Sequence, residues 1–427
     1  MNHFIKIYIG AAIITLGCIA GCKKEHTLSH DPAKPIVIEK FTPQSGGANT
    51  EVLLYGSNFS TDTAEIEVRI NGIKARVIGA IVDRILFEVP KKAGNGKIEV
   101  SIQSAKGTSE DEFAYTPTSV VTTFAGSGQA AFADGSGAEA SFNFGRRSGL
   151  DIDGEGNLYI ADSDNFRVRK ISPDGEVTTL AGSAYGYLEG KGSEAQFFMP
   201  FDIAVDNSGD LYVTDPAAWT VRKITPDGTT SLVVWGEAWG IGLDKRNGNL
   251  YYTNNGNPGS IFRITPDQNV EEIITGLGNP ADVAVDREGD LYVTLAGTSE
   301  VKKFKAETWE VMNTAGQAGN PGLVNGPAAQ AKFDAPWGIA FDPQGNLLIA
   351  GNGSADGSAT NTNQCIRRIN TADWVVSTFA GGSIAGFADG TGSQALFHAP
   401  TGVVADQEGN VFVLDSKNNR IRKVVVE

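Results

Sequence analysis

Three stretches of the chain share one pattern: GLDIDGEGNLYIAD at residues 149–162, DIAVDNSGDLYVTD at residues 202–215 and GVVADQEGNVFVLD at residues 402–415. Each predicts a strand, an Asp, a tight Gly-containing turn and a second strand rich in β-branched and aromatic residues. Related segments occur at residues 240–254, 282–295 and 338–351, so the pattern occurs six times. A β repeat of this kind predicts the blades of a propeller.

Two further strands complete each unit. A third strand is read at VRKI (168–171) and IRKV (421–424), and a fourth at VTTL (177–180). The sixth repeat stops after its third strand, whereas VVTTFAG at residues 120–126 matches the fourth-strand sequence that begins at Val376. We therefore expect residues 120–126 to join the sixth blade and close the ring, which removes the open sheet edges of an unclosed array.

The repeats resemble the NHL family from Val120 to the C-terminus, although Leu295 replaces the acidic residue at the end of the second strand in the fourth repeat. Residues 35–116 contain Phe41-x-Pro43, Gly56-x-Asn58-Phe59 and Phe113-x-Tyr115, and resemble the IPT/TIG family. The two resemblances imply an all-β chain, in which an immunoglobulin-like sandwich precedes a six-bladed NHL-type propeller at residues 117–427. In its family the TIG domain is often a spacer or an adhesion module.

The N-terminus has the features of an export signal. Lys6 precedes a short apolar stretch, which ends in Ile19-Ala20-Gly21-Cys22. This sequence resembles the bacterial lipobox, which implies removal of residues 1–21, acylation of Cys22 and a tether at residues 22–34. An ordinary signal peptide with a chance Cys is the alternative. The architecture resembles lipoproteins of Bacteroides-type bacteria found beside glycan importers, which implies an outer-membrane location on the cell surface, with a periplasm-facing anchor left open.

Composition narrows the range of functions. The formal charge of −15 and the lack of a basic cluster argue against nucleic-acid binding, and 52 glycines favour a turn-rich β protein. His398 is the single His expected within the folded part of the mature chain, and no nucleophile motif is found. We therefore favour a binding protein over an enzyme and expect no cofactor.

Long connections are predicted on one side of the propeller. Those at residues 125–144, 181–200, 315–336 and 380–400 share Ala-Gly and Ala-x-Phe, and two of them contain Phe-Ala-Asp-Gly. They enter blades one, two, five and six, which adjoin one another around the ring. We expect them to raise the rim over these blades and leave a groove open toward blades three and four; packing of the loops on themselves is the alternative.

Aromatic residues at the start of the innermost strands and on the blade-two loops favour a ligand with sugar rings or apolar groups. A glycan is the first candidate, and a membrane importer is a candidate partner. The predicted ligand-binding residues are Phe201, Trp239, Trp337, Arg147, Trp219, Tyr185 and Tyr187.

Two other functions remain open. Four residues end second strands on the loop-bearing side and are candidate ligands for a divalent metal in a hydrolase, lactonase or lyase, although they also suit a loop-bracing role. The other function is that of a protein–protein scaffold or adhesin. The candidate metal ligands are Asp162, Asp215, Asn254 and Asp415.

Overall fold

The computed structural model describes residues 30–145, 148–256, 258–351 and 363–427. The chain divides into two compact units, residues 1–116 and residues 117–427. Cys22 and the rest of the predicted signal lie outside the described residues. Within the described part of the chain, no helix is long and apolar enough to span a membrane.

The first unit is a set of eight strands hydrogen-bonded in the order β1-β3-β6-β5-β4-β7-β8-β2. Alternate residues of most strands are buried, as expected where one face of a strand meets the core. The strands are β1 (Val37–Thr42), β2 (Ser45–Gly46), β3 (Glu51–Ser57), β4 (Ile66–Ile70), β5 (Ile73–Ile81), β6 (Arg84–Glu88), β7 (Gly96–Ile102) and β8 (Ala105–Tyr115).

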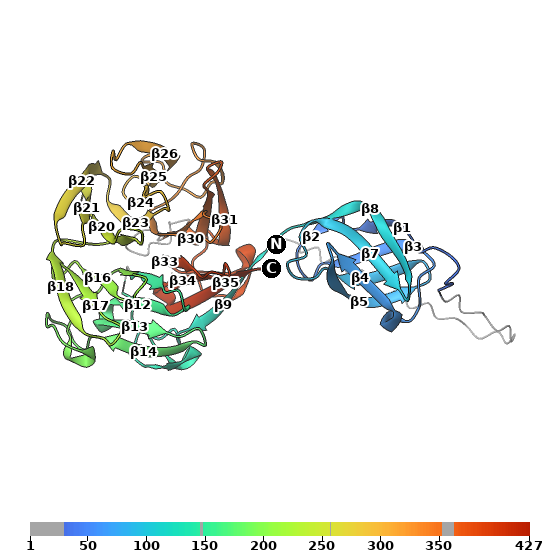
Figure 1. Ribbon diagram of the computed structural model, residues 1–427, viewed down its shortest axis with the longest axis horizontal. Helices are drawn as coiled ribbons and strands as arrows, with labels where there is room; N and C mark the ends of the chain where they lie inside the picture. Colours follow the sequence, from blue (N-terminus) through green and yellow to red (C-terminus); the bar gives the residue numbers. More distant parts are fainter. Residues whose placement is uncertain (1–29, 146–147, 257, 352–362) are drawn as a thin grey trace, which may run out of the picture. The chain divides into compact units, whose positions relative to one another are not determined.

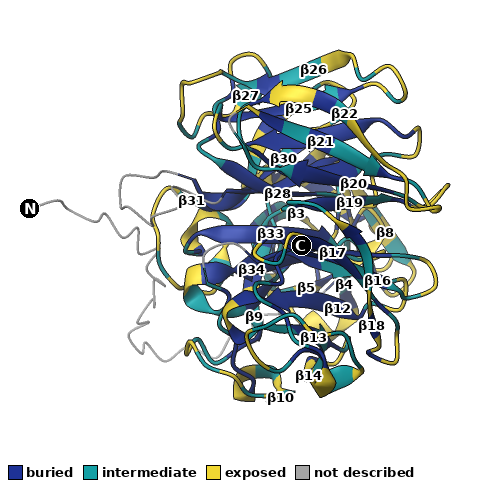
Figure 2. Ribbon diagram, turned by 90° about the vertical axis from the view of Figure 1, so that its left-hand side faces the viewer, coloured by how far each residue is buried: buried dark blue, intermediate teal, exposed yellow. Residues whose placement is uncertain are grey.

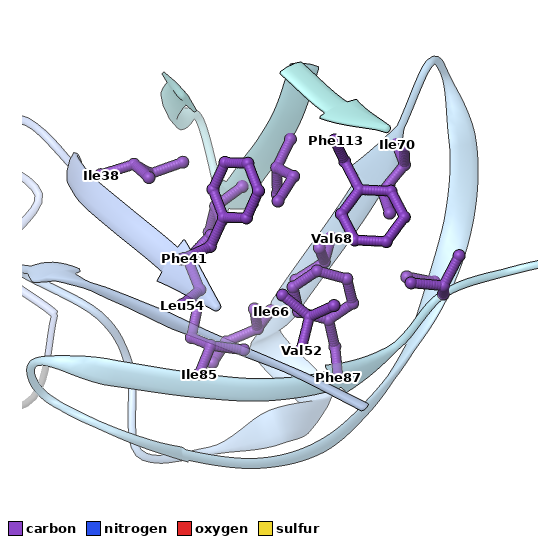
Figure 3. Packing of buried hydrophobic residues seen from close by; sticks show 14 of the residues in the cluster. Ile38, Phe41, Val52, Leu54, Ile66, Val68, Ile70, Ile85, Phe87 and Phe113 are labelled. Atoms are coloured by element: carbon purple, nitrogen blue, oxygen red, sulfur yellow. The ribbon is translucent and has the colours of Figure 1, made fainter. Parts of the chain in front are cut away.

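One apolar core holds this unit together. Phe41 of β1, Phe87 of β6 and Phe113 of β8 are buried with aliphatic residues of the other strands (Figure 3). The predicted tether is too long at its C-terminal end. His30 is buried and its Nδ1 lies 2.9 Å from the carbonyl oxygen of Asn58, so the last tether residues pack against this unit.

The second unit contains six antiparallel sheets that follow one another around a ring (Figure 1). The predicted six-bladed propeller is confirmed. The principal strands, from the axis outward, are β11 (Leu150–Ile152), β12 (Leu158–Asp162), β13 (Arg167–Ile171) and β14 (Glu176–Ala181) in blade one; β15 (Ile203–Val205), β16 (Leu211–Asp215), β17 (Thr220–Ile224) and β18 (Thr230–Trp235) in blade two; β19 (Ile241–Asp244), β20 (Asn249–Asn254), β21 (Gly259–Ile264) and β22 (Val270–Leu277) in blade three; β23 (Pro280–Val285), β24 (Leu291–Leu295), β25 (Glu300–Phe304) and β26 (Val311–Gly316) in blade four; β28 (Pro336–Phe341), β29 (Leu347–Gly351), β30 (Gln364–Asn370) and β31 (Val375–Gly382) in blade five; and β33 (Pro400–Ala405), β34 (Val411–Asp415), β35 (Arg420–Val426) and β9 (Ser119–Ala125) in blade six.

The ring closes through a strand from the beginning of the propeller sequence. β9 pairs antiparallel with β35, from Ser119 opposite Val426 to Ala125 opposite Ile421. Two backbone hydrogen bonds of 2.9 Å between Thr118 and Glu427 extend the pairing. The second strands of the blades, such as β12 and β34, are buried along their whole length (Figure 2). Apolar packing between neighbouring blades thus forms the core of the ring.

The long connections do not build the predicted raised rim. Each runs along the outer edge of its blade and adds a short piece of strand there: β10 (Gly135–Ser136) on β14, β27 (Gly326–Pro327) on β31 and β32 (Gly390–Thr391) on β9. In blade two, Lys191 forms the corresponding bridge with Thr229. The extra length therefore covers exposed sheet edges, which otherwise invite pairing with other chains.

A buried arginine in the third strand holds each of these connections. In blade six, Nη1 of Arg422 donates to the carbonyl oxygen of Leu396 at 3.0 Å and to Asp415 Oδ2 at 2.8 Å. Its Nη2 donates to the carbonyl oxygen of Ala388 at 2.8 Å and to Asp389 Oδ1 at 2.7 Å. All four bonds lie in a site from which the guanidinium has no solvent exposure, so their loss would leave buried polar groups without partners.

The motifs of the connection supply every contact to this guanidinium except Asp415. Asp389 belongs to Phe-Ala-Asp-Gly, and Leu396 is the central residue of Ala-x-Phe. The rings of Phe387 and Phe397 lie 4.8 and 5.2 Å from the guanidinium carbon. The same arrangement recurs in blades one, two and five around Arg169, Arg222 and Arg367.

Replacement of Arg422 by Met is expected to lower the free energy of unfolding of the propeller by about 3–5 kcal/mol, because it leaves Asp415 as a buried carboxylate without its cation. All six Trp residues lie in the propeller, so denaturant unfolding followed by Trp fluorescence reports on this unit. Lys302 occupies the matching position in blade four, where no connection covers the edge. Lys302→Met is the control, and an equal loss in both variants would contradict the anchoring role.

Candidate functional site

Three of the predicted ligand-binding aromatic residues form a packed cluster at the axis. Phe201 and Trp337 are buried, and Trp239 is half-buried beside them. The ring centroid of Phe201 lies 5.0 Å from that of Trp239 and 6.3 Å from that of Trp337, both in edge-to-face arrangements. The prediction brought the right residues together, but most of their surface contacts the protein. Their exposed area is too small for a stacking platform.

Beneath this cluster a cavity of about 670 Å³ follows the axis of the propeller. Phe201 and Trp337 line one end of it. The turn residues Asp153, Asp206 and Asp406 line the other end, on the side opposite the long connections. Between the ends the wall is formed by apolar residues of the innermost strands, such as Ile203. The largest concave feature thus lies inside the ring.

Carboxyl groups narrow this cavity near the aromatic cluster. The first repeat position is Gly in four blades but Asp202 in blade two and Asp282 in blade four. Asp202 Oδ2 accepts a hydrogen bond of 2.9 Å from the backbone N–H of Ile241, and Asp282 Oδ2 accepts one of 3.0 Å from that of Ile339. Each carboxyl group therefore links its blade to the innermost strand of the next blade.

The two carboxyl groups also bond to each other. Burial raises the pKa of Asp202 to about 7. Burial and the charge of Asp202 raise the pKa of Asp282, which donates a hydrogen bond to Asp202. Asp151 of blade one, whose pKa burial also raises, contributes a further charge, and Lys245 opposes it. The Asp202–Asp282 pair consequently holds a proton at neutral pH.

The stability of the propeller is expected to fall between about pH 4 and about pH 7. An unfolded Asp titrates near pH ~3.9, so the folded state retains a proton in this range that the unfolded state loses, and the free energy of unfolding decreases as the pH rises. Asp202→Asn should reduce this fall, since its amide keeps an acceptor for Ile241 and a donor for Asp282. Denaturation midpoints at about pH 5 and about pH 8, with Asp174→Asn as control, test this; an unchanged fall in Asp202→Asn would contradict it.

An exposed aromatic surface does occur, on the loops of blade two. Tyr185 is 65% exposed, Trp219 is 59% exposed and Trp235 is 62% exposed. Tyr187 stacks against Trp235 with ring centroids 5.5 Å apart, and the guanidinium of Arg222 lies 5.1 Å from the Tyr187 ring. The loop carrying both tyrosines thus extends the aromatic surface across the blade.

A second group of rings continues this surface. The ring of Tyr185 lies 4.8 Å from that of Phe198 and 5.4 Å from that of Phe166, in edge-to-face contacts. Phe166 comes from the second-to-third-strand loop of blade one, so the surface spans two blades. We call these six residues the blade-two aromatic surface: Phe166, Tyr185, Tyr187, Phe198, Trp219 and Trp235.

Two of these aromatic residues have left-handed backbone conformations. Phe166 has φ 57° and Trp219 has φ 58°, each immediately before the third strand of its blade. The corresponding residue of blade six is Asn419, with φ 47°, and Asn adopts this conformation most readily after Gly. A bulky side chain costs roughly 1 kcal/mol or more here. Retention of aromatic rings at strained and solvent-facing positions favours a binding role.

The candidate metal ligands are engaged in bracing loops. Asp162 accepts hydrogen bonds from Asn165 and Arg169, and Asp415 bonds to Asn418 and Arg422. Asp215 accepts the backbone N–H groups of Phe198, Met199 and Ala218, and Asn254 Nδ2 lies 3.3 Å from Glu237 Oε2. Among the described residues, no group of three His, Cys, Asp or Glu side chains could hold a metal ion.

Sequence reasoning identified part of this surface. Tyr185, Tyr187 and Trp219 belong to it, whereas Phe166 and Phe198 were not predicted because their exposure depends on loop conformation. Arg147, another predicted ligand-binding residue, lies outside the described residues. The Asp202–Asp282 pair was missed, although alignment of the six repeats places Asp where other blades have Gly.

Comparisons with known proteins agree with this architecture. Residues 35–116 match the IPT/TIG domain family, and residues 397–424 match the NHL repeat. The chain combines a TIG domain with an NHL-repeat propeller. Solved structures with the same fold include an auxiliary nutrient binding protein from Bacteroides thetaiotaomicron, which is 23% identical with a TM-score of 0.60 and coverage of 94% of this chain and 100% of that one.

A second auxiliary nutrient binding protein, from Bacteroides ovatus, is 22% identical with a TM-score of 0.65 and coverage of 93% and 100%. Among curated proteins, NHL repeat-containing protein 2 of Bos taurus is 25% identical over 292 residues, which covers 63% of this TIG–NHL chain. The chain spans only 38% of the length of that bovine protein and 40% of its Gallus gallus counterpart.

Proposed function

We propose that this TIG–NHL protein is a cell-envelope protein that binds an extracellular carbohydrate on the blade-two aromatic surface. The observation that carries the proposal is the exposure of Tyr185, Trp219 and Trp235, one of which has a strained backbone. Tyr and Trp combine a flat apolar face with a polar atom at the edge, which suits sugar rings bearing both C–H faces and hydroxyl groups.

The surroundings of this surface support a polar ligand. The hydroxyl of Tyr187 lies 3.2 Å from Glu189 Oε1, and Glu189 also accepts a hydrogen bond of 2.9 Å from Arg222. Hydroxyl and carboxylate groups therefore lie beside the rings and can exchange hydrogen bonds with a sugar. Similarity in fold to proteins described as nutrient binding proteins agrees with ligand binding in the envelope.

Trp219→Ala and Tyr185→Ala are each expected to weaken carbohydrate binding at least ten-fold, equivalent to about 1.4 kcal/mol. Affinity gels containing soluble plant and mucin polysaccharides provide the first screen, and titration calorimetry with the retained polysaccharide gives the affinity. The control is Ile384→Ala, which removes an exposed apolar side chain from the connection of blade six. Retention of every polysaccharide by both aromatic variants at wild-type strength would exclude this surface as the site.

Anchoring through Cys22 is the second part of the proposal. Replacement by Ser removes the thiol that would carry the lipid, so Cys22→Ser should move the protein from the membrane fraction to the soluble fraction. Metabolic labelling with a radioactive fatty acid should mark the wild-type protein and not the variant. Cys18→Ser is the matched control, because it precedes the predicted cleavage point, and equal labelling of wild type and Cys22→Ser would refute acylation at this position.

A further inference from the structure

The outer edges of the blades are protected in different ways. In blades one, five and six, the connection that covers the edge presents an Asp or Asn side chain to a pair of residues, an Arg of the third strand and a Thr of the fourth. Asp134 Oδ1 accepts hydrogen bonds from Arg169 at 2.7 Å and from Thr179 at 3.1 Å. These two strand residues are direct partners in the sheet register. Together they form a receptor for one side-chain oxygen of an extended segment.

The same receptor recurs in the other two blades. Asn325 Oδ1 accepts hydrogen bonds from Arg367 and Thr378, and Asp389 Oδ1 accepts them from Arg422 and Thr123. In both blades the Arg and the Thr are opposite each other in the sheet. A cation and a hydroxyl at this register position thus accompany a covered edge.

Blade four has this pair without a covering segment. Lys302 of β25 lies opposite Thr314 of β26, in the register of the Arg–Thr pairs. Lys302 Nζ lies 3.5 Å from Glu300, a residue of its own strand. Among the described residues, no strand pairs with the outer edge of β26. The receptor is therefore open to a segment from outside the described chain.

The exposed residues of this edge are apolar. Val311 is 54% exposed and Met312 is 50% exposed, and β26 contains no charged residue. Proteins usually protect an uncovered edge with charges. Blade three follows that rule, because its edge strand β22 carries Glu271 and Glu272 and has Phe262 where the other blades have a cation.

We propose that the outer edge of β26 docks an extended segment of a partner protein, whose backbone adds a strand to blade four and whose Asp or Glu side chain binds Lys302 and Thr314. The connections on the other blades show the geometry of such an occupant. Strand addition supplies backbone hydrogen bonds, and the side-chain receptor supplies the specificity. Val311 and Met312 would contact apolar side chains of the incoming strand.

A second copy of the chain fits this edge less well. Two β26 strands paired with each other would bring no carboxylate to either Lys302, because the strand has none. The formal charge of −15 also opposes self-association. Charge complementarity therefore favours an acidic segment from another protein.

A peptide with the sequence of residues 129–142, the connection that covers blade one, is the probe. Titrated into the full ¹⁵N-labelled chain, it should shift backbone amide resonances of β26 and bind by NMR with a measurable Kd. Met312→Lys places a charge on the edge and should weaken binding at least ten-fold. Val270→Lys makes the same change on the edge of blade three and should leave the affinity unchanged. Trp fluorescence checks that both variants are folded.

A charge exchange tests the receptor separately. Lys302→Glu should weaken the peptide at least ten-fold, and a peptide with Asp134→Lys should bind this variant better than it binds the wild type. Absence of binding, or equal binding to Met312→Lys, would overturn the proposal. Sedimentation that showed a wild-type dimer lost in Met312→Lys would assign the edge to a second copy and would also overturn it. Carbohydrate binding is measured on blade two, so the failure of one proposal is distinguishable from failure of the other.

Discussion

A guanidinium buried between a blade and its covering connection is the interaction on which the propeller depends. Arg422 has no exposed surface, and its four hydrogen bonds join the third strand to carbonyl groups and carboxylates far away in the sequence. The desolvation of such a cation is offset only when all of its donors find acceptors. The repetition of Phe-Ala-Asp-Gly and Ala-x-Phe follows from this requirement, because each motif supplies a ring and acceptors to one arginine.

Much of the fold followed from the sequence, because β alternation and turn residues are local properties. The strand–turn–strand pattern of residues 149–162 defined the blades, and the match between residues 120–126 and the fourth strands predicted the closure. The course of the long connections was not predicted. It depends on Arg169 and its equivalents, which look like ordinary charged residues of an amphipathic strand until their burial is known.

The candidate site shows the same division. Sequence placed Phe201, Trp239 and Trp337 at equivalent positions around the axis, and they do meet there. Whether they contact solvent or each other depends on the width of the ring at that level, which residue spacing does not encode. Trp219 remains exposed because its left-handed backbone turns the loop, a feature that a bulky residue does not announce in sequence.

The pairing of β9 with β35 has a consequence for how the molecule reaches its folded state. The partners are separated by roughly 300 residues, so the contact that completes blade six brings together the most distant parts of the propeller sequence. Closing so long a loop costs chain entropy before any reward from the ring, which slows folding. Early blades must therefore persist with unsatisfied neighbours until the final strand arrives, and an exported chain that threads through a membrane in an extended state would complete its ring only on the far side.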